Sequence, residues 1–148
     1  MTAEQVSAGG TFVVDLVFPE HMNHHGTLFG GRALELMTRA AFIGATRAVR
    51  QRLVIAAAQE VTFLSPVHPG ELIEAVPSIE RIGRSSVRAR VDVYAEDLTS
   101  GSRRSAIRGH FTLVAVDAAG RPMPVRSAGT RADQPQGSRS AADQRSTA

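Results

Sequence analysis

Apolar residues follow two different periods along this chain, and the change of period divides it into elements. They recur at every second position of residues 11–18, which is typical of a strand with one buried face, and Pro19 ends this alternation. Residues 29–50 are instead apolar on almost every side and include many small residues. This pattern predicts one long helix that is buried rather than laid on a surface.

The two-residue period returns after Gln51. It predicts four further strands, over residues 53–63, 72–82, 87–95 and 107–115. Pro77 inside the second of these indicates a bulge or an edge position, and Arg108 and His110 are expected to face outward on the last. Antiparallel strands wrapped around one central helix make an α+β fold.

The chain of 148 residues fits one domain, which the pattern places at residues 1–126. Residues 127–148 are small, polar or charged and show no period, so they are expected to be disordered. A domain of this plan leaves part of its helix and sheet edge uncovered. A homodimer is therefore expected.

Composition narrows the classes of function. The chain has no cysteine, which excludes disulfides, a thiol nucleophile and thiolate metal ligands. No apolar stretch is long enough to cross a membrane, so a cytoplasmic protein without membrane contact is expected. All 17 basic residues are arginine, but a net charge of +3 is too small to indicate nucleic-acid binding.

The segment from His21 to Gly31, with sequence HMNHHGTLFGG, precedes the predicted helix. Its histidines lack the spacing of zinc ligands, and it has neither the lysine of a phosphate loop nor a dinucleotide glycine pattern. If Thr27 caps the helix, its first turn leaves glycine N–H groups open to a carbonyl oxygen, as in an oxyanion hole. A tight turn against a neighbouring subunit explains the glycine pair equally well.

The pattern Asn-x-x-Gly-x-x-Phe-Gly-Gly, formed by Asn23, Gly26, Phe29, Gly30 and Gly31, resembles the opening of the hotdog-fold acyl-CoA thioesterases, in their acyl-CoA hydrolase branch. The similarity continues through VTFLSPVHPGELIE, RIGRSSVRARVDVYAED and FTLVAVDAAGRPMPV, and so spans about residues 11–125. It implies a hotdog dimer, often assembled further into hexamers, with the active site at the dimer interface. It also implies acyl-CoA as substrate, hydrolysed by water without a metal or cofactor.

The resemblance also implies roles for single residues. Asn23 matches an asparagine that helps to position the water, and Gly30 and Gly31 match the amides that polarise the thioester carbonyl. The turn with Arg84, Ser85 and Ser86 lies where the family contacts CoA, and an arginine with two hydroxyls suits phosphate oxygens. The alternative for this turn is a plain hairpin with a solvated arginine. The candidate catalytic residues are Asn23, His25, Gly30, Gly31 and Thr38, and the candidate substrate-binding residues are Phe29, Gln59, Arg84, Ser85 and Ser86.

The chain departs from the family at the general base, because Thr38 stands where this branch carries an aspartate on the helix. A threonine hydroxyl can hold a water molecule but cannot deprotonate it near neutral pH. Glu35, Glu60 and His25 are the candidate replacements, and Glu35 can instead pair with Arg39 on the helix surface. Uninterrupted alternation predicts that Gln59 faces the helix and that Glu60 faces away.

Two functions remain open. The first is acyl-CoA hydrolysis with a displaced base or with an oriented water, favoured because Asn23 and both glycines are retained. The second is a non-hydrolytic hotdog protein that binds acyl-CoA as a sensor or partner. A hotdog dehydratase is a weaker third hypothesis, since its Asp/His pair is not visible.

Overall fold

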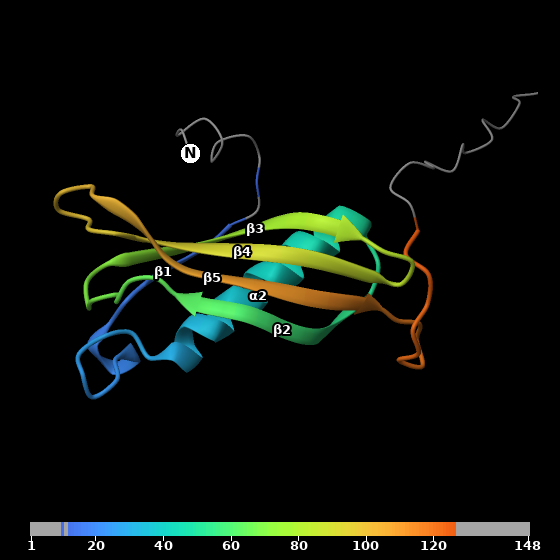
Figure 1. Cartoon of the computed structure of the whole chain (residues 1–148), viewed down its shortest axis with the longest axis horizontal. Coiled ribbons are helices and arrows are strands. Elements are labelled where there is room, and N and C mark those ends of the chain that lie inside the picture. The colour runs from blue at the N-terminus through green and yellow to red at the C-terminus, as the bar shows by residue number, and fades with distance from the viewer. Residues whose placement is uncertain (1–9, 11, 127–148) are drawn as a thin grey trace, which may run out of the picture.

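The computed structural model describes residue 10 and residues 12–126. Its elements are β1 (Val13–Leu16), the 3-10 helix η1 (Pro19–His21), α2 (Gly30–Val49), β2 (Leu53–Phe63), β3 (Leu72–Ile82), β4 (Ser86–Glu96) and β5 (Arg103–Ala115). All five strands join one antiparallel sheet in the order β1-β3-β4-β5-β2. This confirms the predicted α+β plan of one long helix and an antiparallel sheet (Figure 1). The disorder expected for residues 127–148 lies outside the described residues.

Most strand boundaries agree with the alternation. β2 and β3 begin and end at the predicted residues, whereas β5 begins at Arg103 rather than at Ile107. The extra residues of β5 continue the ladder with β4, whose register pairs Glu96 with Arg103. Backbone pairing with a neighbour extends the strand beyond the apolar pattern that signals it.

Pro77 lies at an edge, as predicted. β1 pairs only with residues 72–75 of β3, so the backbone of Pro77 faces no strand on that side. A proline is tolerated there because it has no N–H to contribute to a ladder. The irregularity in the pairing of β3 with β4 falls at Glu80 instead.

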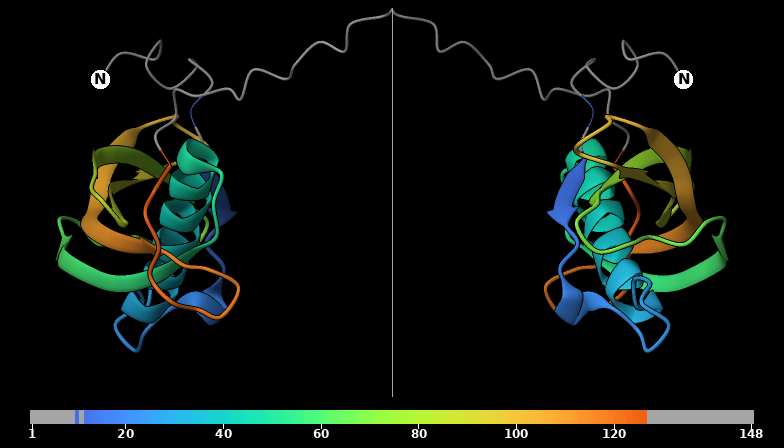
Figure 2. Two further views of the ribbon diagram at one scale, coloured as in Figure 1. Left: turned by 90° about the vertical axis from the view of Figure 1, so that its right-hand side faces the viewer. Right: turned by 90° about the vertical axis from the view of Figure 1, so that its left-hand side faces the viewer.

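The sheet curls around one side of α2, and the core lies between them (Figure 2). The largest fully buried side chains include Phe111, Met37, Ile73, Ile107 and Leu113. Small residues let the helix approach the sheet closely: a Cβ built on Gly44 would lie 2.7 Å from Cγ of Pro77.

The other side of α2 is not covered. Leu34, Thr38 and Phe42 recur every four residues and so form one row along the helix; we call this row the open stripe. Leu34 and Phe42 are 37% and 43% exposed. The prediction that the helix is buried all round is therefore wrong for the single chain, since the sheet reaches around only part of it.

Irregular pairing changes the direction of side chains along β2. Its register with β5 shifts between Ile55 and Ala57 and again between Gln59 and Thr62. Gln59 is consequently paired with His110, and directly opposed residues of antiparallel strands share a face. Gln59 therefore lies on the outer face of the sheet, and the expectation that it faces the helix is corrected.

Candidate active site

The loop before α2 is closed by the side chain of Asn23. Its Oδ1 accepts the backbone N–H of His25 at 2.9 Å and that of Thr27 at 3.2 Å, while its Nδ2 donates to Oγ1 of Thr27 at 3.0 Å. Gly26 has a φ of 78°, which glycine adopts without strain. Because backbone N–H groups can only donate, the orientation of the Asn23 amide is determined, and one of its Nδ2 hydrogens stays free.

The helix begins at Gly30, one residue later than expected, and its N-cap lies two residues later. Its N-cap is Phe29 rather than Thr27, whose hydroxyl is engaged by Asn23. The carbonyl of Phe29 accepts the N–H groups of Arg32 and Ala33. Within the described residues, the N–H groups of Gly30 and Gly31 have no acceptor. They are two of the free donors at the positive end of the helix dipole.

A pocket of about 450 Å³ opens beside this first turn. Its lining residues are Asn23, Thr27, Leu28, Gly30, Phe63, Leu64, Ser65, Pro66, Val67 and Ile107. The wall is mainly apolar with a few polar groups, which is typical of a small-molecule site. The carbonyl of Val67 accepts the N–H of Leu28 at 2.8 Å and so joins the two sides of the pocket.

The segment between β2 and β3 was missed as a pocket wall, because Pro66 and Pro69 indicated only a turn. Leu64 and Ser65 follow β2, and their N–H groups both point to the carbonyl of Ala106. A signal was present: this segment belongs to the second stretch that resembles the thioesterases. Only the contact with Leu28 shows that it faces the helix N-terminus.

Thr38 does not line this pocket. It lies eight residues beyond Gly30, which corresponds to about 12 Å along a helix. Its Oγ1 donates to the carbonyl of Leu34 at 2.7 Å. The hydroxyl proton is therefore engaged within the helix, and only the lone pairs of the oxygen remain to bind a water molecule.

The candidate bases occupy three different environments. Glu35 accepts hydrogen bonds from Arg32 and Arg39 on the helix surface. Glu60 has a φ of 53° and lies over the outer face of the sheet, near Arg88 and His110.

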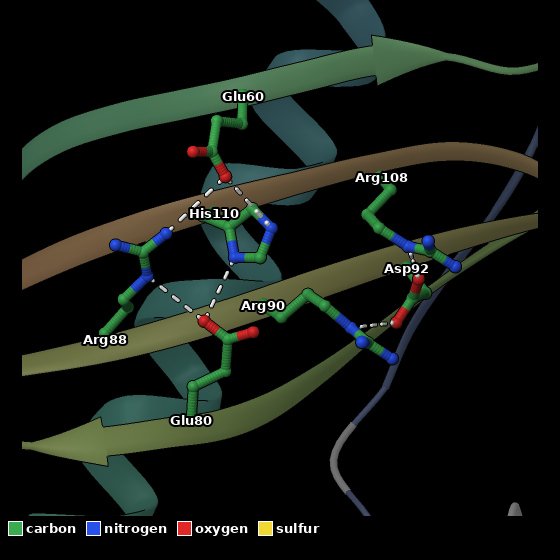
Figure 3. A network of polar contacts seen from close by, with 7 residues as sticks. All are labelled: Glu60, Glu80, Arg88, Arg90, Asp92, Arg108 and His110. Carbon is green, nitrogen blue, oxygen red and sulfur yellow. Dashed lines mark hydrogen bonds and ion pairs between the residues drawn. The ribbon is translucent and has the colours of Figure 1, made fainter.

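Figure 3 shows Glu60 in a network with Glu80, Arg88 and His110, on the side of the sheet away from α2. That position separates Glu60 from the pocket within one chain. His25 is exposed, and its ring lies 3.8 Å from that of His24. The backbone N–H of His25 donates to Oδ1 of Asn23, which lines the pocket. His25 is therefore the candidate base that the loop holds beside the pocket.

Arg84, Ser85 and Ser86 lie at the opposite end of the molecule, in the turn between β3 and β4 (Figure 1). They line a hollow of about 370 Å³ together with Arg81, Gly83, Arg88 and Thr112. The helix between the two ends is 20 residues long, or about 30 Å. The structure thus separates the predicted site residues into a group around the helix start and a group at the turn after β3, while Thr38 and Gln59 belong to neither.

Positive charge accumulates at this second end. The arginines there that form no ion pair with a described residue are Arg50, Arg52, Arg81, Arg84, Arg121 and Arg126. Oδ1 of Asp117 accepts the N–H groups of Ala119 and Arg121, each at 2.9 Å. This end of the molecule can therefore bind an anion without first breaking an ion pair.

Two further observations bear on the kind of site. In the described part of the chain, no three histidine or acidic side chains are arranged to hold a metal ion. Nor is any described helix both long and apolar enough to span a membrane.

Comparison with known proteins identifies the family. Residues 25–102 match the thioesterase superfamily, and the chain belongs to it. It is 36% identical over 109 residues to an uncharacterised acyl-CoA thioester hydrolase of Bacillus subtilis, covering 74% of this chain and 63% of that relative. The chain thus spans less than two thirds of that protein.

Solved structures show the same fold. An acyl-CoA hydrolase from Staphylococcus aureus, determined with butyryl-CoA and CoA, is 30% identical with a TM-score of 0.73, covering 78% of this chain and 70% of that one. A hexameric thioesterase from Yersinia pestis is 31% identical with a TM-score of 0.73, covering 80% and 98%.

Proposed function

We propose that this protein hydrolyses acyl-CoA thioesters by direct attack of water, at a site shared between two chains. The observation that carries the proposal is the open first turn of α2, where Gly30 and Asn23 line a largely apolar pocket and the N–H groups of Gly30 and Gly31 have no acceptor among the described residues. The related hydrolase determined with butyryl-CoA and CoA supports the substrate class.

The first turn of α2 serves as the oxyanion hole. Attack by the water oxygen on the thioester carbonyl carbon places negative charge on the carbonyl oxygen, and the amides of Gly30 and Gly31 stabilise it. The free Nδ2 hydrogen of Asn23 is a donor in the same pocket. The intermediate then collapses with cleavage of the C–S bond, which releases the fatty acid and the CoA thiol.

His25 serves as the proton acceptor. A histidine imidazole has a ring nitrogen that can take a proton from the attacking water and return it to the departing sulfur. Thr38 holds the water through its oxygen lone pairs, since its own proton is bonded to Leu34.

A second chain is needed because of distance. Gly30 and Thr38 are about 12 Å apart along one helix, so both can act at one carbonyl only if they come from different chains. A symmetric dimer through β2 and the open stripe would set the two helices antiparallel. The arginine-rich end of one chain then lies toward the helix N-terminus of the other, where it binds the CoA phosphates. Assembly of such dimers into a hexamer is consistent with the hexameric relative.

One observation favours the second function, binding of acyl-CoA without hydrolysis. The residues that line the pocket include no carboxylate. A protein of this kind would retain the anion site and the acyl pocket and would lack turnover.

A thiol-release assay across acyl chain lengths separates the two functions, with Thr38→Asp as the informative variant. General-base assistance contributes about 10²–10⁴-fold, so a carboxylate at this position should raise the rate if no other group assists the water. If His25 already serves as the base, the same change should have little effect or lower the activity. His25→Ala should abolish turnover while Glu60→Ala spares it. If wild type and Thr38→Asp both bind CoA and neither hydrolyses any acyl-CoA, the binding function is correct.

A further inference from the structure

Two neighbouring arginines at the start of β5 make similar ion pairs. Arg103 pairs with Glu74, and Arg104 pairs with Glu71 through Nη1 to Oε1 at 2.6 Å and Nη2 to Oε2 at 2.8 Å. The arginine side chains are 31% and 36% exposed, and the glutamate side chains are 10% and 12% exposed. The two pairs therefore match in chemistry and burial, and their arginines are adjacent in β5.

Only the Arg104 pair reaches the pocket wall. Nη2 of Arg104 also donates to the carbonyl of Pro66 at 2.6 Å, and Oε2 of Glu71 accepts the N–H of His68 at 2.8 Å. The pair thus holds residues 66–71 at both ends. Arg103 lies instead with its guanidinium 4.3 Å from the ring centre of Tyr94.

The held segment contacts the helix N-terminus directly. Pro66 and Val67 line the pocket, and the carbonyl of Val67 accepts the N–H of Leu28, two residues before Gly30. One guanidinium is therefore linked to the oxyanion donors through the Pro66–Val67 backbone and a single hydrogen bond.

The chemistry of this link requires an arginine. A guanidinium presents several donors in a rigid plane and can bind a carboxylate and a carbonyl together, whereas an ammonium is a single point of charge. The hydrogen bond from Arg104 outweighs the effect of burial and lowers the pKa of Glu71 from its ordinary value of 4.5, so the carboxylate stays ionised at neutral pH.

We propose that Arg104 is a positioning residue, which holds the wall formed by Pro66 and Val67 against the first turn of α2 and so sets the fit of the thioester. This inference rests on the proposed hydrolytic function. Without Arg104, the wall and Leu28 shift relative to Gly30, while the fold persists.

The test compares Arg104→Lys with the matched control Arg103→Lys. Both should lower the melting temperature by a similar amount, because each weakens one buried-carboxylate pair. Only Arg104→Lys should lower kcat/KM for an acyl-CoA, by roughly 10- to 100-fold, the scale expected for misplacement of about 1 Å. Equal kcat/KM in the two variants would overturn the proposal.

A second measurement does not depend on activity. Amide hydrogen exchange at Leu28 should accelerate by about tenfold or more in Arg104→Lys and stay unchanged in Arg103→Lys. If wild type hydrolyses no acyl-CoA, the proposed function is wrong. The exchange rate of the Leu28 amide in the two variants still shows whether Arg104 positions the pocket wall. If Arg104→Lys does not fold, the milder Glu71→Gln takes its place, and unchanged exchange at Leu28 in it would overturn the proposal.

Discussion

The side chains of Asn23 and Thr38 are both partly committed to local hydrogen bonds. Oδ1 of Asn23 is taken by its own loop, which leaves an N–H donor, and Oγ1 of Thr38 donates to Leu34, which leaves lone pairs. One residue can therefore stabilise an oxyanion and the other can accept a hydrogen bond from water. Asparagine and threonine can each donate and accept hydrogen bonds. The local hydrogen bonds of the loop and the helix decide which of these capacities stays available.

The side chain of Arg84 is expected to bind a phosphate of CoA. Arg84→Ala should raise KM for acyl-CoA about tenfold, the value of one charge-assisted hydrogen bond, and leave kcat nearly unchanged. The reason is that a phosphate lies far from the reacting carbon. Steady-state kinetics with Arg108→Ala as control, an exposed arginine on the outer face of the sheet and outside that hollow (Figure 3), should show no such rise. Equal KM values for the two variants would show that residues 83–86 form a plain turn without a role in CoA binding.

At the scale of elements, the contact between α2 and β3 depends on a missing side chain. Gly44 lies inside the helix, where glycine costs about 1 kcal/mol relative to alanine. The ring of Pro77 occupies the space that a Cβ would need. The close approach of helix and strand explains why a poor helix former stands there.

This contact predicts the opposite sign from helix propensity. Gly44→Ala should lower the free energy of unfolding by about 1–3 kcal/mol, because overpacking against a rigid ring outweighs the gain in propensity. Urea unfolding at fixed protein concentration measures it. In a Pro77→Ala background the same change should cost much less. Stabilisation by Gly44→Ala in both backgrounds would show that the ring moves aside freely.

At the scale of the whole molecule, a single chain leaves two association-prone features uncovered among the described residues. The open stripe on α2 and the outer edge of β2 are uncovered, and the two groups of predicted site residues lie at opposite ends. Edge strands and apolar rows of this kind favour association. In the proposed dimer, a second copy covers both features and brings one group of each chain toward the other group of its partner.

Phe42→Glu should therefore shift the protein toward monomers, because it places a charge on the open stripe. Light scattering at micromolar concentration measures this, and thiol release should fall with the loss of dimer if the site is shared. Leu98→Glu is the control, since Leu98 is 56% exposed in the turn between β4 and β5 and should leave assembly and activity unchanged. A monomer that keeps full activity would contradict the shared site.

The sequence by itself determined most of the elements and much of the first group of candidate site residues. The period of the apolar residues indicates which face of an element is buried, so β2, β3 and α2 could be located without tertiary information. Asn23 and Gly30 lie seven residues apart around one helix start, so local geometry brings them to the same pocket.

Tertiary structure alone decided the remaining features. The face of Gln59 depends on irregular pairing between β2 and β5, which no alternation reveals. The contact of Arg104 with Glu71 joins residues 33 positions apart, and the hydrogen bond from Leu28 to the carbonyl of Val67 joins the helix start to the segment between β2 and β3. Each of these depends on the register and distance between segments that are remote in the chain, and such relations arise only when the strands pair and the helix packs.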